Sequence, residues 1–358
     1  MTDSSLRILF TLDYEIHGNG EGCPRELMVE PTQRLLRLFD RFGAKLTIMA
    51  DFAEILRFKE YAQKTGKDDY HYHDIVHQLQ SAVGGGHDVQ LHVHSSYFNA
   101  SQKDGHWVQD WSEYNFAGLS PERLDEIVRQ GKAFLESILR PVKSNYRCIA
   151  FRAANWSVSP SRNVVQALAK NGILVDSSVF KYGRREGLVN FDYSAAHSEM
   201  LPWRADTDAI WRQNPTGAIW EVPIYSESRK LPAFLSVNRM YRFVSGRRHR
   251  VPNTNPYTSG DSAPRRSPSK LHRLARLAGK HAWKADFNQC TGRQLIAALR
   301  RGAQRHRQEP GILPFVLIGH SKLFTRWNER SLCPFLAYVR RNSSRFAFGT
   351  FDSLNLTV

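Results

Sequence analysis

Residues 6–12 read LRILFTL and run directly into Asp13, Tyr14 and Glu15. A short apolar run ending in polar residues is typical of a strand buried on both faces of a parallel sheet. Because side chains alternate along a strand, Asp13 and Glu15 would share one face. Parallel barrels carry their chemistry at the carboxyl ends of the strands. The stretch therefore predicts a buried strand with two acids at its functional end, although a loop of solvated acids fits the same letters.

Apolar runs alternate with segments of helical periodicity along most of the chain, as in successive βα units. This order predicts an α/β fold, a single (β/α) barrel domain spanning residues 1–358. Predicted strands are 6–12, 45–49, 88–93, 146–152, 173–176, 220–224 and 314–318, and predicted helices are 31–42, 74–83, 121–139, 164–170 and 294–305.

The chain of 358 residues is long enough to bury a large core without disulfides or a structural metal. Its four cysteines show no CxxC or Cys/His spacing, which argues against a zinc finger and fits a reducing compartment. Neither an apolar leader nor a run of about 20 apolar residues is present. We therefore expect a cytoplasmic protein.

The net charge of +16 is concentrated in one region. The stretch from Arg239 to Lys284 contains twelve Lys and Arg residues and one acid, Asp261, which gives it a net charge of +11. Residues 245–284 are rich in Pro, Ser, Asn and Arg at their start, which predicts a basic flexible insertion followed by a short basic helix. Such a segment suits a diphosphate or an anionic membrane surface, and a solvated charged loop explains it at least as well. Nucleic-acid binding is a weaker alternative, because the charge is local and no recognition motif accompanies it.

A histidine pair, His92 and His94, closes the third predicted strand. On an extended chain both imidazoles point the same way, which suits two ligands of one zinc or similar ion. One core histidine and one exposed histidine would explain the same spacing.

Further polar residues follow later strands. Arg152 and Trp156 come after one strand; the arginine could pair with a carboxylate, and the tryptophan could form an apolar wall against a sugar ring. Asp176 and His320 follow two others, where an acid could poise the histidine as a general acid. A structural arginine, a core tryptophan and a buried histidine are the alternatives.

The order of these clusters along the chain resembles the five-motif layout of polysaccharide deacetylases of the NodB-homology, carbohydrate-esterase type. The resemblance covers most of the chain apart from the basic insertion, and it implies a distorted barrel of the polysaccharide-deacetylase type. In the common form of the first motif two acids are adjacent, whereas TLDYE matches a variant with one residue between them. On this basis Asp13 would be the base and Glu15 a metal ligand, with the reverse assignment left open.

The second motif departs from the usual pattern of that family, in which two metal histidines lie four residues apart. Here the residue four after His92 is Ser96. His94 would replace the missing ligand, as in bacterial O-antigen-cluster deacetylases with an LHxH form. The FRAANW and GHSK segments also resemble that subgroup.

The resemblance implies a metal-dependent hydrolase that removes an N-acetyl group from an amino sugar. A divalent ion, expected to be Zn²⁺, would be bound by Glu15, His92 and His94. The catalytic residues would be Asp13, Arg152, Asp176 and His320, with Trp156 and Tyr14 contacting the substrate. A nucleotide sugar or a lipid-linked glycan is the expected partner, and the enzyme would be cytoplasmic or peripheral to the inner membrane. A barrel that binds carbohydrate without cleaving it is the main alternative.

Overall fold

The strands form one curled, mainly parallel sheet in the computed structural model, which describes residues 5–16, 18–246 and 279–356. Its order is β10-β11-β7-β6-β3-β2-β1-β14, with β15 also pairing with β1. Only β10 runs antiparallel to its neighbour. The strands are β1 Ser5–Tyr14, β2 Leu46–Asp51, β3 Asp88–Val93, β6 Ala150–Ala153, β7 Val175–Asp176, β10 Trp203–Arg204, β11 Trp220–Glu221, β14 Ile312–His320 and β15 Phe346–Phe348.

Two irregular segments bridge the gap between the ends of this sheet. Ile224 pairs in parallel with Val316 of β14, and Asp286 pairs in parallel with Ile318 of the same strand. The amide of Ala285 also donates to the carbonyl of Tyr225. The sheet therefore curls into a distorted barrel, with isolated bridges where regular strands would complete it.

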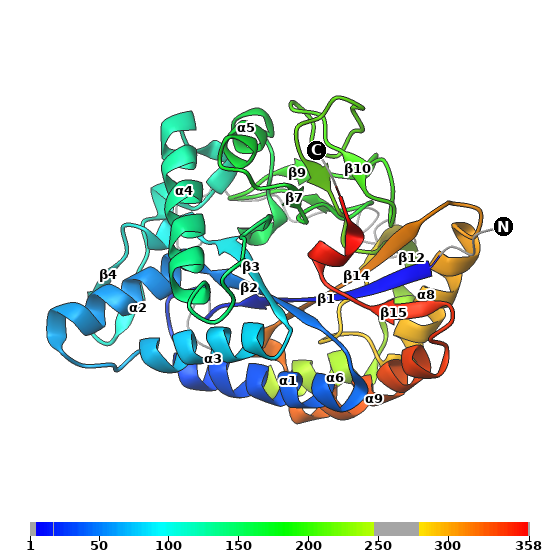
Figure 1. The fold of residues 1–358 in the computed structure, drawn as a ribbon, viewed down its shortest axis with the longest axis horizontal. Coiled ribbons are helices and arrows are strands. Elements are labelled where there is room, and N and C mark those ends of the chain that lie inside the picture. Colours follow the sequence, from blue (N-terminus) through cyan, green and yellow to red (C-terminus); the bar gives the residue numbers. More distant parts are fainter. Residues whose placement is uncertain (1–4, 17, 247–278, 357–358) are drawn as a thin grey trace, which may run out of the picture.

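Helices cover the outside of the sheet (Figure 1). Helices α1, α3, α6 and α9 lie along the lower edge of the view, and α4 and α5 lie above the strands. The α-helices are α1 Glu30–Phe42, α2 Phe52–Thr65, α3 Tyr72–Gly84, α4 Pro121–Leu139, α5 Arg162–Lys170, α6 Val237–Gly246, α8 Gly292–Arg305 and α9 Arg326–Arg341. Short helices are η1 Arg25–Val29, η2 Ser95–Tyr97, η3 Trp111–Glu113, η4 Phe116–Gly118, η5 Ala154–Trp156, η6 Leu231–Phe234, η7 Ser321–Leu323 and η8 Phe351–Leu354.

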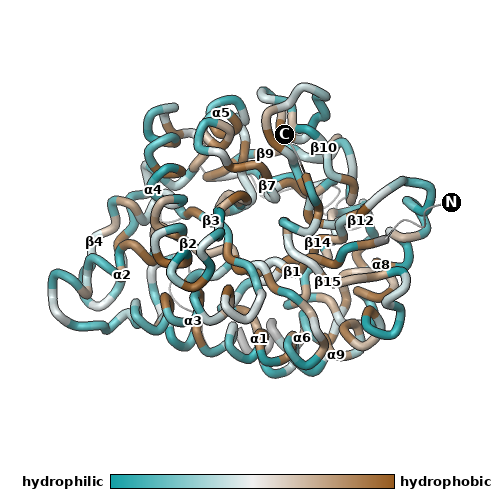
Figure 2. Tube along the Cα trace, viewed as in Figure 1, coloured by the Kyte–Doolittle hydropathy of each residue, from teal (hydrophilic) through white to brown (hydrophobic). Residues whose placement is uncertain are grey.

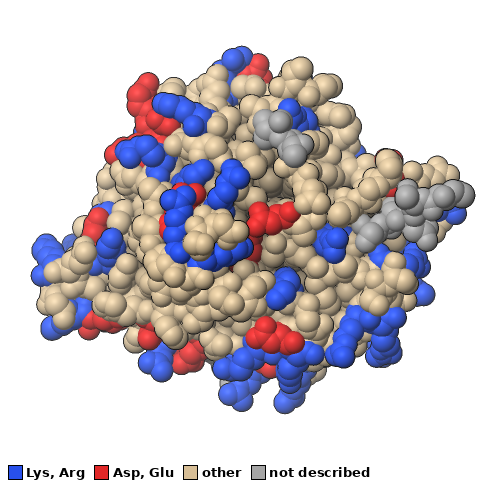
Figure 3. Space-filling model, viewed as in Figure 1, with Lys and Arg blue, Asp and Glu red and all other residues tan. Residues whose placement is uncertain are grey.

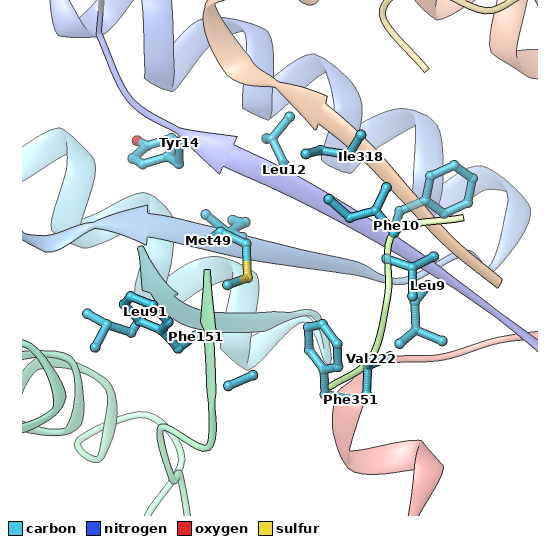
Figure 4. Close-up of a cluster of buried hydrophobic side chains, with 14 of the residues drawn as sticks. Leu9, Phe10, Leu12, Tyr14, Met49, Leu91, Phe151, Val222, Ile318 and Phe351 are labelled. Atoms are coloured by element: carbon cyan, nitrogen blue, oxygen red, sulfur yellow. The ribbon is translucent and has the colours of Figure 1, made fainter. Parts of the chain in front are cut away.

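The core fills the space inside the sheet and between the sheet and its helices. Apolar residues follow the central strands, and the outer turns of the helices are hydrophilic (Figure 2). Side chains of β1, β2, β3, β6 and β14 meet Val222 and Phe351 in one buried cluster (Figure 4). Strands β2 and β3 are buried along their whole length, including their polar residues Thr47, Asp51, Asp88, Gln90 and His92.

The predicted basic insertion, residues 245–284, falls mostly outside the described residues. Its last residues, Lys280–Lys284, form strand β13, which pairs antiparallel with β12, Ser226–Lys230. The predicted short basic helix therefore does not extend over residues 280–284. These residues pair with β12 and form a strand instead. Two further hairpins join β4 Ser101–Lys103 to β5 His106–Val108 and β8 Arg184–Arg185 to β9 Phe191–Asp192. Among the described residues, no helix has the length and apolar character needed to cross a bilayer.

Candidate active site

A cavity of about 370 Å³ opens where the strands end, and most of the predicted site residues line it. Strands β1, β3 and β14 place their final residues there, and the loops that follow them complete the wall. The lining residues are Asp13, Glu15, Gly18, His92, His94, Tyr114, Asn155, Trp156, Gln289, His320, Lys322 and Leu323.

Asp13 is paired with a fully buried arginine. Arg152 donates from Nη1 to Oδ1 of Asp13 and to Oγ1 of Thr11, both at 2.8 Å, and from Nε to the carbonyl of Ser177 at 2.8 Å. Burial raises the pKa of Asp13, but the charges of Arg152, His92 and His320 outweigh it and hold that pKa below its ordinary value. Asp13 is therefore ionised at neutral pH and fixed in direction, as a general base must be.

Glu15 lies two residues on, along the same face of β1. Its Oε1 atom lies 2.8 Å from Nζ of Lys322. Its Oε2 atom lies 3.4 Å from Nε2 of His92 and 3.1 Å from Nδ1 of His94. That oxygen is buried, and the described part of the chain gives it no further hydrogen-bond partner beside these two imidazoles. Burial raises the pKa of Glu15, yet the cations around it keep that pKa well below its ordinary value.

The two histidines are held by different partners. His92 donates from Nδ1 to the carbonyl of Arg152 at 2.8 Å, which leaves its Nε2 lone pair facing Glu15. His94 places Nδ1 2.5 Å from Oδ2 of Asp51. Burial lowers the pKa of each histidine, but the surrounding acids raise both above the ordinary value. The pocket therefore favours extra positive charge between these side chains.

Glu15, Asp51, His92 and His94 present ligand atoms that all lie within 4.8 Å of one another. Imidazole nitrogen and carboxylate oxygen are donors that zinc and similar divalent ions accept. The buried Oε2 of Glu15 between the two imidazoles and the raised pKa of both histidines are what such an ion would satisfy. The residues present therefore fit a divalent cation.

Asp51 was not among the residues expected from the sequence. It ends β2, and its Oδ1 accepts from the amides of Ala53 and His94, at 3.2 Å in both cases. The same side chain thus caps α2 and holds His94. An acid at the end of a predicted strand was the available signal, but its proximity to His94 depends on the register of β2 against β3.

Ser96 holds the position that the usual family pattern gives to a second histidine. It is buried and donates from Oγ to Oε1 of Gln109 at 2.7 Å. Ser96 does not line the cavity, whereas His94 does. The role of His94 as the replacing ligand stays a prediction.

His320 lies beside both acids at the end of β14. Its Nε2 atom is 3.5 Å from Oδ2 of Asp13 and 3.9 Å from Oε1 of Glu15. Its amide donates to Oδ1 of Asn288 at 2.6 Å, which fixes the strand end. Burial lowers the pKa of His320, and the nearby acids Asp13 and Glu15 oppose that shift.

Asp176 does not partner His320 as expected. Its carboxylate accepts from the hydroxyl and the amide of Ser178, and its carboxyl neighbour is Glu221. Both acids are fully buried, and burial raises the pKa of each. Strand pairing explains the difference, because Glu221 of β11 lies directly beside Asp176 of β7, whereas His320 is carried by β14.

Trp156 lines the cavity, as expected for a substrate contact. One face of its indole is covered by Lys284, whose Nζ lies 3.2 Å from the ring centroid, and the ring of His320 meets it edge-on at 6.0 Å. Burial lowers the pKa of Lys284 to about 8. Trp156 and Asn155 both have positive φ, 60° and 56°, a conformation that costs free energy and often marks a functional site.

Tyr14, the other expected substrate contact, lies in the core instead. It is fully buried, and its hydroxyl donates to Oε1 of Gln78 on α3 at 2.9 Å. Strand alternation causes this, because the residue between Asp13 and Glu15 must face the opposite side of β1.

No family model matches the sequence, and no curated protein does. Among solved structures, the chain is similar to a candidate glycoside hydrolase/deacetylase from Parabacteroides distasonis, with 11% identity, a TM-score of 0.51, and coverage of 98% of this chain and 70% of that chain. It is also similar to a 4-alpha-glucanotransferase from Thermococcus litoralis, with 11% identity and a TM-score of 0.51, covering 99% of this chain but 41% of that chain. A candidate polysaccharide deacetylase from Mycobacterium smegmatis aligns over 98% of this chain and 88% of its own, with 15% identity and a TM-score of 0.47.

At these identities the likeness establishes the fold alone. The chain has a distorted (β/α) barrel of the polysaccharide-deacetylase type, and the sequence-based prediction of that fold is confirmed. What the barrel does must be argued from the residues in its cavity.

Proposed function

We propose that this protein is a metal-dependent hydrolase that removes an acetyl group from the nitrogen of an amino sugar. One observation carries the proposal: a single cavity holds an arginine-paired Asp13, a buried oxygen of Glu15 between two histidines, and His320. The proposed base, the proposed cation ligands and the proposed acid thus all face the same cavity. Glu15, rather than Asp13, is assigned as the carboxylate ligand, because Arg152 already engages Asp13.

The chemistry divides among these side chains. When bound by Glu15, His92 and His94, a divalent ion such as Zn²⁺ would polarise the amide carbonyl and lower the pKa of water. Asp13 takes a proton from the water whose oxygen adds to the carbonyl carbon. The proton that Asp13 has taken from the water passes through His320, whose Nε2 lies 3.5 Å from Asp13, to the departing nitrogen as the C–N bond breaks. The products are acetate and a free amine.

The surroundings of these residues support their roles. Arg152 keeps Asp13 ionised, and Lys322 holds the second oxygen of Glu15 at 2.8 Å. Asp51 and the carbonyl of Arg152 orient the two imidazoles. Trp156 provides an aromatic wall for the sugar, although Lys284 already occupies one of its faces.

The substrate class proposed is an N-acetylated sugar in a nucleotide-linked or lipid-linked precursor, as in O-antigen assembly. Lys322 and Lys284 bring positive charge to the neighbourhood of the cavity, which would suit a substrate that carries phosphate. The enzyme would then work in the cytoplasm or at the inner membrane.

The test is acetate release from a panel of N-acetylated amino sugars and their nucleotide-linked forms, with Zn²⁺, Co²⁺ or Mn²⁺ added. The wild type should release acetate, and Asp13→Asn should lower kcat by about 10² to 10⁴. The matched control is Asp208→Asn, which changes an exposed acid that pairs with Arg162 on the surface. Deacetylation that survives Asp13→Asn would refute the assignment of the base.

A carbohydrate-binding barrel without turnover is the second candidate, because Ser96 stands where a second histidine is usual and faces Gln109 instead. Sugar binding measured by calorimetry without acetate release, for every sugar and metal tried, would select it.

A further inference from the structure

Apolar side chains gather on one part of the surface. Of the eight exposed large hydrophobic residues among those described, five belong to one cluster, which we call the apolar platform; they are Leu235, Val237, Met240, Tyr241 and Trp327. Leu235 and Met240 are 74% and 64% exposed. The rings of Tyr241 and Trp327 stack with 6.2 Å between centroids, which joins α6 to the start of α9. Contiguous exposed apolar surface of this kind marks an interaction site.

The platform is anchored beside the cavity. Ser236 donates from Oγ to the carbonyl of Gln289, a residue that lines the cavity. Asn238 donates to the carbonyl of Cys290 and accepts from the indole of Trp327 at 2.8 Å. Helix α9 itself follows η7, whose Leu323 also lines the cavity. A surface bound by the platform would therefore lie next to the mouth of the active site.

Positive charge surrounds the platform. Arg326 and Arg330 are exposed on the first turns of α9, and Arg37 is exposed on the neighbouring α1. Burial lowers the pKa of Arg34, and the charges of Arg326 and Arg37 lower it further. Two acids lie among them: Glu329, which pairs with Arg34, and Glu30 in the first turn of α1. Lys and Arg side chains gather along the lower edge of Figure 3, where α1, α6 and α9 lie in Figure 1.

We propose that the apolar platform and these arginines dock the protein on an anionic lipid surface. Aromatic and aliphatic side chains enter the interface while arginines contact the headgroups, the combination found in proteins that bind membranes peripherally. A second copy of the chain fits less well, because symmetric pairing would oppose two basic surfaces. Docking would also present the cavity to a lipid-linked sugar, a consequence that rests on the proposed function.

The experiment is cosedimentation of the full chain with vesicles of phosphatidylcholine, with and without phosphatidylglycerol. We expect binding that requires phosphatidylglycerol. The double variant Leu235→Gln/Met240→Gln and the double variant Arg326→Gln/Arg330→Gln should each bind about tenfold more weakly. Val108→Gln/Leu188→Gln removes two exposed apolar residues elsewhere and should bind like the wild type.

The outcomes separate docking from catalysis. Hydrolysis of a soluble acetylated sugar should be unchanged in the Leu235→Gln/Met240→Gln variant, since neither residue lines the cavity. Vesicle binding without any deacetylation would leave docking intact and refute the proposed function. Absence of binding, or binding that the platform variants do not weaken, would overturn the docking proposal. A dimer seen by light scattering that these variants dissociate, without vesicle binding, would assign the platform to self-association and overturn it as well.

Discussion

Arg152 contacts one of the two acids of the cavity, Asp13, and its backbone holds one of the two histidines. Its side chain is fully buried and contacts Asp13, Thr11 and the backbone of Ser177, while its own carbonyl holds His92. A buried charge of this kind is stable only while its partner is present. Arg152 therefore keeps Asp13 charged and, through its carbonyl, orients His92.

Replacing Arg152 with glutamine should impair folding and turnover together. The change leaves Asp13 buried without its cation, which raises the pKa of Asp13 and costs about 3–5 kcal/mol of stability. We expect kcat to fall by about 10² or more, because the base becomes protonated. Urea unfolding and acetate release measure the two effects. Arg162→Gln, an exposed arginine paired with Asp208, should change stability by only about 0.5 kcal/mol, and an equal loss in both variants would contradict this account.

Asp176 and Glu221 form a buried carboxyl pair with a predictable pH dependence. Burial raises the pKa of both, and Asp176 further raises that of Glu221. A carboxyl group with a raised pKa in the folded state contributes its stability fully below the unfolded value, about 4, and loses it as the pH rises through the folded pKa.

Glu221→Gln should therefore flatten the dependence of stability on pH. The amide keeps the shape and the acceptor for the amide of Val179, at 3.1 Å in the wild type, but cannot ionise. The midpoint of thermal unfolding, measured between about pH 4 and 8, should fall less with rising pH in the variant than in the wild type. A difference that stays constant across this range would show that the pair does not titrate as proposed.

At the scale of elements, the carboxyl ends of β1, β3 and β14 bring residues from distant parts of the chain into one cavity, and the end of β2 supports His94 beside it. The β2–α2 junction has two tasks there, because Asp51 caps the helix and holds His94. The capping contacts use Oδ1, which also accepts from the amide of His94, whereas the imidazole of His94 contacts Oδ2.

Asp51→Asn should separate these two tasks. Asparagine caps helices about as well as aspartate, so the free energy of unfolding should change by no more than about 1 kcal/mol. The negative charge beside His94 is lost, and we expect metal affinity to fall by about 10- to 100-fold. Calorimetric titration of Zn²⁺ measures the affinity, with Asp110→Asn at the cap of η3 as the control. Unchanged affinity would show that Asp51 serves the helix alone.

At the scale of the whole molecule, the regular parts of the barrel could be predicted from the sequence. Strand 88–93 and helix 121–139 match the structure residue for residue, because a buried strand and an amphipathic helix leave clear patterns. Helix α2 was missed, since Phe52–Thr65 follows β2 without a loop and the strand ends on its capping residue. Segment 285–287 was missed because it contributes isolated bridges rather than a strand.

The site was predictable where strand periodicity alone decides direction. Alternation along β1 placed Asp13 and Glu15 on one face, and the same rule should have directed Tyr14 to the other. Contacts between strands were not predictable, because they depend on the strand order of the barrel. The pairing of Asp176 with Glu221, and the proximity of Asp51 to His94, follow from that order.

The most direct test of the central claim is the metal content of the purified protein, measured by mass spectrometry after reconstitution with Zn²⁺. We predict about one divalent ion per chain in the wild type, in Asp13→Asn and in the control His73→Gln, which changes an exposed histidine of α3. The double variant His92→Gln/His94→Gln should bind none. A wild type that holds no ion, or a double variant that keeps it, would contradict the account.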